Sequence, residues 1–279
     1  MTKKFMFAML AAVLTAGVVT GCGKVSGNSG SSGKSEKSEE KASMKLDMER
    51  IAADEARGIK FSDDKRTLIK YNRQLKDSEY TIPDGVTTIG DGAFFHCDLT
   101  SVTIPSSVTV IGKEAFMGGV KLTGVTIPSS VTSIGEGAFA ECAAVKVASG
   151  NSVFYNDASG ALIDRKRKIF LYLPRDFSGA YTIPSGVTGI GDLAFFSCMS
   201  LTSVTIPDGV TTIGKHAFRF CHKLVSVTIP DGVTTIGESA FFQCISLTRV
   251  TIPSSVTSIG HDAFSWCPCE RSVKRQFTK

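Results

Sequence analysis

A pattern of hydrophobic and polar positions with a period of about 23 residues recurs seven times along the chain. Each copy reads approximately [V/Y]-T-I-P-[D/S]-[G/S]-V-T-x-I-G-x-x-A-F-x-x-C. The prolines that mark the copies are Pro83, Pro105, Pro128, Pro184, Pro207, Pro230 and Pro253. Successive prolines lie 22, 23, 56, 23, 23 and 23 residues apart. A period of this size predicts stacked repeats, each of which buries its apolar face against its neighbours.

One copy, beginning at Leu201, shows what each repeat should form. Val204, Thr205 and Ile206 alternate as in a short strand, so Val204 and Ile206 should point inward and Thr205 outward. Pro207 cannot donate to a strand ladder, so the strand should end there. One short strand per copy, followed by an irregular return path, predicts a repeat solenoid whose parallel strands form one curved sheet. Few or no regular helices are expected apart from a short N-terminal one.

Three further columns of the repeat are constant or nearly so. A glycine follows the second Ile in every copy and predicts either positive φ or a backbone approach without room for Cβ. Its members are Gly90, Gly112, Gly135, Gly191, Gly214, Gly237 and Gly260. A phenylalanine spine is predicted from Phe94, Phe116, Phe139, Phe195, Phe218, Phe241 and Phe264. An exposed ribbon of hydroxyl groups is predicted from Thr81, Thr103, Thr126, Thr182, Thr205, Thr228 and Thr251.

A cysteine column lies fourteen residues after the repeat prolines and consists of Cys97, Cys142, Cys198, Cys221, Cys244 and Cys267. Gly119 takes this place in the second copy. Stacked Cβ atoms would lie about 4.8 Å apart, which is wider than the roughly 3.5–4.5 Å of a disulfide. Zinc sites use short paired spacings, which this column lacks. Small buried side chains are therefore expected, with disulfides or a metal as the alternatives. Cys267-Pro268-Cys269 either ends the last repeat or forms a redox-active pair.

The 56-residue gap also has internal order. Phe61–Pro83 aligns without gaps to Leu162–Pro184, a shift of 101 residues. The gap therefore holds one variant unit, within an insert at about 146–180. The extra residues near 151–160 are rich in turn-forming types and predict a small protruding hairpin.

The repeat resembles the BspA-like leucine-rich repeats of bacterial surface proteins. The resemblance extends over roughly residues 61–267. It implies a curved leucine-rich-repeat solenoid. It also implies adhesion to host extracellular-matrix proteins or to other cells, so proteins are the expected partners.

The N-terminus resembles a bacterial lipoprotein signal. Lys3 and Lys4 precede an apolar run, residues 5–19, that is too short for a comfortable membrane span. The sequence Val-Thr-Gly-Cys follows, so cleavage before Cys22 and lipidation of Cys22 are expected. An ordinary signal peptide or a signal anchor is the alternative. The lipoprotein reading implies an exported protein, anchored by lipid at the bacterial cell envelope or surface.

Four segments follow from this reading. Residues 1–21 form the signal peptide, and residues 22–41 form a tether rich in Gly, Ser, Lys and Glu. Residues 42–57 place Met44, Met48 and Ile51 on one face of a short amphipathic helix, which should cap the open end of the stack. The solenoid then occupies residues 58–279.

Composition and charge exclude several function classes. Hydrophobic residues make up 42% of the chain and charged residues 20%, which is ordinary for a globular protein. Without Lys3 and Lys4 the chain has 29 basic and 26 acidic residues, a balance too weak to indicate nucleic-acid binding. The four histidines occupy variable positions and no G-x-S-x-G motif is present. We therefore expect that the protein is not an enzyme and that it binds no cofactor, metal or small-molecule substrate.

Binding specificity should therefore lie at the variable positions. The threonine ribbon lacks the Trp, Tyr and Arg anchors of energetic hot spots. The candidate partner contacts on the return path and in the insert are Phe95, His96, Met117, Phe154, Tyr155, Phe196, Arg219, Phe220, Phe242 and Trp266. For Trp266, capping the exposed end of the core is the favoured role, because terminal repeats must shield what internal ones bury, and a partner contact is the alternative. These features predict a surface-anchored repeat protein that mediates adhesion or protein–protein interaction. The alternative is a structural or assembly module of the cell envelope.

Overall fold

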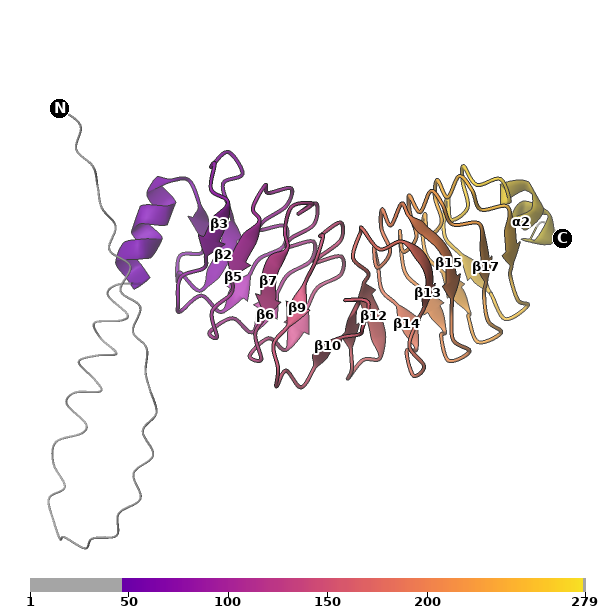
Figure 1. Ribbon diagram of the computed structural model, residues 1–279, viewed down its shortest axis with the longest axis horizontal. Helices are drawn as coiled ribbons and strands as arrows, with labels where there is room; N and C mark the ends of the chain where they lie inside the picture. Colours follow the sequence, from indigo (N-terminus) through magenta and orange to yellow (C-terminus); the bar gives the residue numbers. More distant parts are fainter. Residues whose placement is uncertain (1–46, 278–279) are drawn as a thin grey trace, which may run out of the picture. The chain divides into compact units, whose positions relative to one another are not determined.

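The computed structural model describes residues 47–277, with side chains described as far as Val273. The predicted signal peptide, the lipidation site Cys22, the tether and the first residues of the predicted capping helix lie outside the described residues. Residues 47–56 are helical, as the amphipathic pattern predicts. The remainder is a solenoid of parallel β-strands, which confirms the predicted fold class. Figure 1 shows one turn of this solenoid, here called a rung, for each copy of the repeat.

Each rung contributes a first strand from its Val-Thr-Ile segment. These strands form two four-stranded parallel sheets. One consists of β3 (Glu79–Thr81), β5 (Ser101–Thr103), β7 (Gly124–Ile127) and β9 (Lys146–Val147). The other consists of β13 (Gly179–Thr182), β15 (Leu201–Thr205), β17 (Ser226–Thr228) and β19 (Arg249–Thr251). Val204 is buried and Thr205 is exposed, as the alternation predicts, and Thr205 pairs in register with Thr228.

The prediction of one sheet is wrong, because each rung forms a second short strand where the chain returns. The five-stranded sheet contains β1 (Lys60–Phe61), β2 (Thr67–Lys70), β4 (Thr88–Ile89), β6 (Val110–Ile111) and β8 (Ser133–Ile134). The seven-stranded sheet contains β10 (Phe154–Asn156), β11 (Leu162–Asp164), β12 (Ile169–Tyr172), β14 (Gly189–Ile190), β16 (Thr212–Ile213), β18 (Thr235–Ile236) and β20 (Ser258–Ile259). Most of these second strands are only two residues long. They still form a sheet, because every rung repeats the pairing in register.

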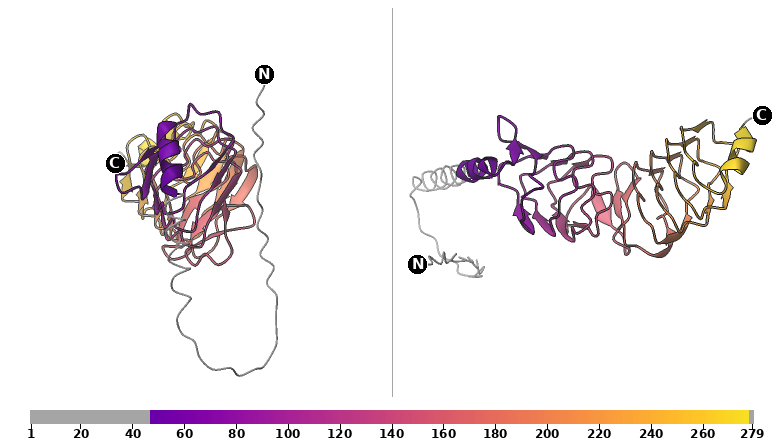
Figure 2. Two further views of the ribbon diagram at one scale, coloured as in Figure 1. Left: turned by 90° about the vertical axis from the view of Figure 1, so that its left-hand side faces the viewer. Right: turned by 90° about the horizontal axis from the view of Figure 1, so that it is seen from above.

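The third side of each rung is a turn segment that also bonds to its neighbour. In the first two rungs the N–H groups of Gly92, Phe94 and His96 donate to carbonyl oxygens of the next rung at 2.7–2.8 Å. Three sides of backbone hydrogen bonds therefore fix the register of the stack. Figure 2 shows that the stacked rungs follow a curved path.

The glycine column reflects close packing between rungs. A Cβ atom at Gly112 would lie 2.5 Å from an oxygen of Asp91, and one at Gly260 would lie 2.3 Å from the nitrogen of Glu238. Neither glycine has positive φ. Of the two reasons that the sequence left open, the close backbone approach is therefore the correct one at these positions.

The core consists of stacked rings, as the phenylalanine column predicts. Phe94 stacks on Phe116 with ring centroids 4.9 Å apart, and Phe218 stacks on Phe241 at the same distance. The buried residues nevertheless form two clusters rather than one. We call the rungs before the insert the N-terminal half and the rungs after it the C-terminal half.

The insert lies between these two cores. Leu162 of β11 packs in the N-terminal core, whereas its neighbour Ile163 packs in the C-terminal core. Strands β10 and β11 pair antiparallel, so the predicted hairpin is present. Its predicted protrusion is wrong, because Phe154 is 1% exposed and packs in the N-terminal core. The buried Asn151 helps to close that core, since its Nδ2 donates to the carbonyl oxygens of Pro128 and Val131.

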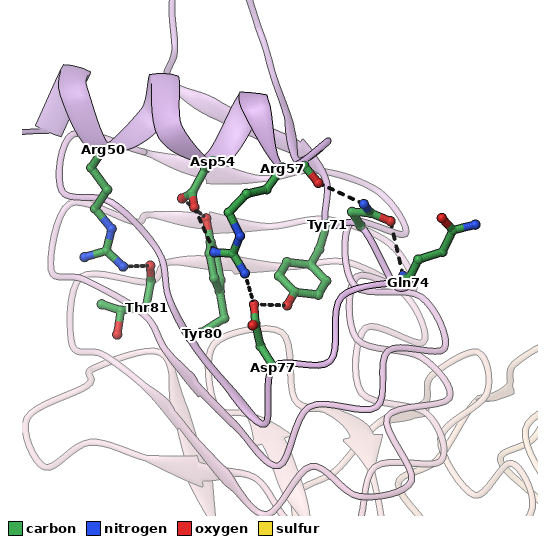
Figure 3. A network of polar contacts seen from close by, with 9 residues as sticks. Arg50, Asp54, Arg57, Tyr71, Gln74, Asp77, Tyr80 and Thr81 are labelled. Carbon is green, nitrogen blue, oxygen red and sulfur yellow. Dashed lines mark hydrogen bonds and ion pairs between the residues drawn. The ribbon is translucent and has the colours of Figure 1, made fainter. Parts of the chain in front are cut away.

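The N-terminal end is closed by the helix of residues 47–56 and a polar network (Figure 3). The hydroxyl of Tyr80 donates to the buried Asp54 on the helix at 2.7 Å. Arg57 pairs with Asp54 and with Asp77, and the hydroxyl of Tyr71 also donates to Asp77, at 2.9 Å. This network is consistent with the predicted capping role of the helix.

The C-terminal end is closed only in part. An eight-residue helix that the sequence pattern did not predict, α2 (Glu270–Phe277), buries Val273 against the last rung. The N–H of Trp266 donates to the Glu270 carboxylate at 3.2 Å. Within the described residues, the N–H groups of Asp262 and Phe264 have no acceptor, although the equivalent groups of most other rungs bond to the next rung.

Candidate interaction surface

The third side of the solenoid holds most of the predicted partner contacts. Two variable residues follow the buried Ala-Phe pair in each rung. The second of them has positive φ in every rung: His96, Gly118, Glu141, Ser197, Phe220, Gln243 and Trp266. For a residue with Cβ this conformation costs about 1–3 kcal/mol. Bulky Phe220 and Trp266 therefore occupy positions where glycine would favour folding.

Four of the predicted contacts converge in the C-terminal half, and we call them the aromatic turn cluster: Phe196, Arg219, Phe220 and Phe242. The ring of Phe220 lies edge-on to Phe196 at 5.5 Å and to Phe242 at 6.2 Å between centroids. The Arg219 guanidinium carbon lies 4.8 Å from the Phe220 ring centroid and 4.7 Å from that of Phe242. All four side chains are half-buried, so the rings remain open to a partner.

Arg219 is incompletely satisfied within this cluster. Its Nε is buried and has no hydrogen-bond partner. Its Nη1 lies 3.4 Å from Nδ1 of His216. Burial, and secondarily the Arg219 charge, hold the pKa of His216 below its usual value of 6.5. Neutral His216 can therefore accept from Arg219 and leaves its positive charge uncancelled.

Apolar side chains flank the cluster in the same turns. Met199 is 44% exposed and follows Phe196 by three residues. Ile245 is 57% exposed and follows Phe242 by the same interval. Trp266, in the last rung, is 70% exposed, so it does not cap the core. The turns that carry Phe196 and Phe242 therefore also expose large apolar side chains.

The corresponding turns of the N-terminal half form no such cluster. Phe95 lies edge-on to His96 in its own turn, with ring centroids 4.3 Å apart. Met117 is half-buried beside Gly118, and the next rung has Ala140 at the equivalent position. Of the predicted contacts in the insert, Tyr155 is half-buried with Arg165 over its ring at 5.1 Å. Phe154 is the core residue described above, so it is unsuitable as a partner contact.

The described cysteines are free and buried. Several thiols donate to a carbonyl oxygen of the preceding rung, for example Cys221 to Phe195 at 3.1 Å and Cys244 to Phe218 at 3.1 Å. Burial raises the pKa of the Cys142 thiol to about 12. The column therefore behaves as the small core side chains that its spacing predicts. No group of three metal-ligating side chains gathers anywhere in the described part of the chain.

Hollows of comparable volume lie at three places outside the aromatic turn cluster. One, of about 480 Å³, lies over the last rung between Phe264 and α2. A second, of about 360 Å³, lies where the second strands of the two halves meet, with Arg167, Asp192 and Lys215 at its rim. A third, of about 370 Å³, lies at the N-terminal end, beside Lys60 and Lys70. The repeat pattern does not predict these hollows, because they arise where the repeat is interrupted or ends. No helix in the described residues is long and apolar enough to cross a membrane.

The sequence also matches the family described as the BspA type leucine-rich repeat region, in six copies over residues 71–158 and 178–274. A leucine-rich cell surface protein from Faecalibacterium prausnitzii A2-165 has a similar crystal structure, with 33% identity and a TM-score of 0.57. That match covers 68% of this chain and 57% of the other, so this chain corresponds to little more than half of that protein.

A leucine-rich repeat protein from T. pallidum is 28% identical over 79% of this chain and 93% of its own, with a TM-score of 0.42. The pneumococcal vaccine antigen PcpA is 18% identical over 73% of this chain and 69% of its own, with a TM-score of 0.45. A comparison with curated proteins gives no match.

Proposed function

Because the chain belongs to the BspA-type leucine-rich repeat family, we propose that it binds other proteins at the bacterial cell surface through the aromatic turn cluster. Proteins of this repeat class are typically interaction modules, which offer an extended surface rather than a reactive cavity. The observation that carries the proposal is the convergence of Phe196, Phe220 and Phe242 around Arg219, because aromatic and arginine side chains dominate binding hot spots.

The surface location rests on two further considerations. The similar Faecalibacterium prausnitzii protein is itself called a cell surface protein. The N-terminal sequence of this chain fits a lipoprotein signal, in which Cys22 would carry the lipid after cleavage. Lipidation would tether the solenoid to the membrane without a spanning helix. In this arrangement the chain mediates adhesion to host matrix proteins or to neighbouring cells.

Adhesion is tested with the full-length chain, presented to immobilised matrix proteins and to whole cells. The test variant combines Phe220→Gln, which copies Gln243 of the next rung, with Phe242→Ala, which copies Ala140. Since truncating hot-spot residues costs at least about 2 kcal/mol, binding should weaken about 30-fold or more. The control variant combines Thr205→Ala and Thr228→Ala on the exposed strand face and should bind within about two-fold of wild type. Equal binding by the test variant would refute the proposed site.

The anchor has its own test. Mass spectrometry of the native N-terminus should find acyl chains on Cys22 as the first residue. Replacement Cys22→Ala should release the protein from the membrane fraction into the medium. An unmodified Cys22 that is retained within a longer chain would contradict the anchor and leave the binding proposal standing.

The second candidate function is a structural module that assembles through the solenoid ends. It is favoured by the hollow over the last rung and by the N–H groups of Asp262 and Phe264, which have no acceptor in the part of the chain that the structure describes. Such groups are a template for pairing with another chain. Cross-linking in intact cells distinguishes the two functions, because assembly predicts mainly self-linked products and adhesion predicts foreign partners.

A further inference from the structure

Arg219 is the strongest indication of what kind of partner the aromatic turn cluster takes. Its guanidinium lies against the rings of both Phe220 and Phe242 and makes no ion pair within the described residues. Its Nε is buried without an acceptor, and among the described residues the guanidinium makes a polar contact only with neutral His216. An unsatisfied buried donor lowers folding stability, and each cation–π contact recovers only part of that loss.

The fold does not require an arginine at this position. The equivalent residues in the other rungs are Phe95, Met117, Ala140, Phe196, Phe242 and Ser265, and all of these rungs have the same buried Ala-Phe pair. An apolar side chain such as Met could cover the same rings without a buried, unpaired donor. The guanidinium therefore calls for an explanation outside the folding of the rung.

We propose that Arg219 pairs with a carboxylate of an acidic, apolar-flanked segment of a partner protein. The inference rests on the proposed function and names the chemistry of its partner. The planar guanidinium matches a carboxylate through two parallel N–H···O bonds, which are short and strong. Apolar side chains beside the carboxylate pack on Phe196 and Phe242 and on the exposed Met199 and Ile245.

The surrounding charges favour an acidic partner. Lys215 and Lys223 are exposed in the same rung as Arg219. The acidic groups that act on His216 are Glu238 and Asp192, and neither forms an ion pair with Arg219. Excluding water with apolar side chains around Arg219 lowers the local dielectric constant and strengthens its attraction to a carboxylate. A phosphate group alone would leave this apolar rim unused, so an acidic peptide fits the whole surface better.

A random peptide library displayed on phage, selected on the immobilised full-length chain, tests the inference without a known ligand. We expect selected peptides to be enriched in Asp or Glu next to large apolar residues. The variant Arg219→Met, which copies Met117 of another rung, should bind synthetic copies of these peptides at least ten-fold more weakly. Its thermal unfolding midpoint should stay equal to that of wild type or rise. The matched control is Arg249→Met, an exposed arginine on β19, which should bind within about two-fold of wild type.

Two outcomes overturn the inference alone and are distinguishable from failure of the proposed function. Selected peptides without acidic residues, or unchanged binding by Arg219→Met, would show that Arg219 recognises no carboxylate. If such peptides still lost binding with Phe220→Gln and Phe242→Ala, the proposed site would stand and only its partner chemistry would fail. A lower unfolding midpoint of Arg219→Met with unchanged peptide binding would assign Arg219 a packing role. No selection at all would count against both proposals.

Discussion

The two halves of the solenoid have the same core and different turns. Phe94, Phe116 and Phe139 stack in the N-terminal half as Phe195, Phe218 and Phe241 do in the C-terminal half. On the turn side, however, only the C-terminal half brings aromatic rings of successive rungs into contact around an arginine.

This difference separates the residues that the fold requires from those that are available for binding. Because the N-terminal half folds with Met117, Gly118 and Ala140 in its turns, the solenoid needs no aromatic residues there. The rings and the guanidinium of the C-terminal half are additions to a fold that is complete without them.

The largest expected effect tests whether the two cores are equivalent. Phe116→Ala and Phe218→Ala each remove a fully buried ring and should each lower the free energy of unfolding by about 3–5 kcal/mol. Strands β11 and β12 place side chains in both cores, so each variant should unfold in one transition. Urea unfolding followed by circular dichroism measures both quantities. Two separate transitions would show that the halves unfold independently.

A smaller loss of stability is expected when the tyrosine hydroxyl at the start of either half is removed, and its size should differ between the halves. Tyr80 donates to Asp54 on the N-terminal helix, and the equivalent Tyr181 donates to Asp157 in the insert. Tyr80→Phe should cost about 1–3 kcal/mol, because Asp54 is buried and keeps only a long contact to Arg57.

Tyr181→Phe should cost less, about 0.5–1.5 kcal/mol, because Asp157 retains two backbone donors at 2.8 and 3.0 Å. Thermal unfolding of the two variants side by side measures the order. A larger loss for Tyr181→Phe would mean that the insert, rather than the helix, is the more important closure.

The smallest effect is a pH dependence confined to the C-terminal half. The pKa of His216 is lowered from 6.5 by burial and by Arg219, whereas the equivalent position in the N-terminal half is Glu114. Below pH 6.5 the unfolded chain binds the proton more readily than the folded chain does. The stabilisation from neutral His216 is therefore present above pH 6.5 and is lost as the pH falls through the folded value.

His216→Gln should accordingly lose less stability than wild type between about pH 7.5 and about pH 5, as measured by urea midpoints. The control is His261→Gln, at a more exposed histidine of the last rung. An identical pH profile for wild type and His216→Gln would show that His216 titrates normally in the folded protein.

Much of the fold could be predicted because the same pattern of residue types recurs in seven copies. The inward and outward positions around Thr205, the ring stack and the buried cysteines all follow from residue type and period. The second strands could not be predicted, since pairs such as Thr212–Ile213 are too short for alternation to show. Their pairing depends on the neighbouring rung, which holds them in register.

The insert and the site were predictable only in part. The turn-rich segment near residue 155 predicts a hairpin, but nothing in its composition shows that Phe154 lies against one core and Ile163 against another. Column spacing places Arg219 beside Phe242 in adjacent rungs. The lack of a hydrogen-bond partner for Nε of Arg219 could not be predicted, because it depends on side-chain conformations.

The buried cysteine column makes local unfolding of the solenoid detectable by chemical modification. A thiol such as that of Cys221 or Cys244 lies fully buried and bonded to the preceding rung, and burial raises its pKa, so it is inert while the rungs stay together. Once a rung separates from its neighbour, its thiol becomes reactive. Because nearly every rung carries one cysteine, alkylation followed by peptide mapping would show where along the solenoid the structure first gives way.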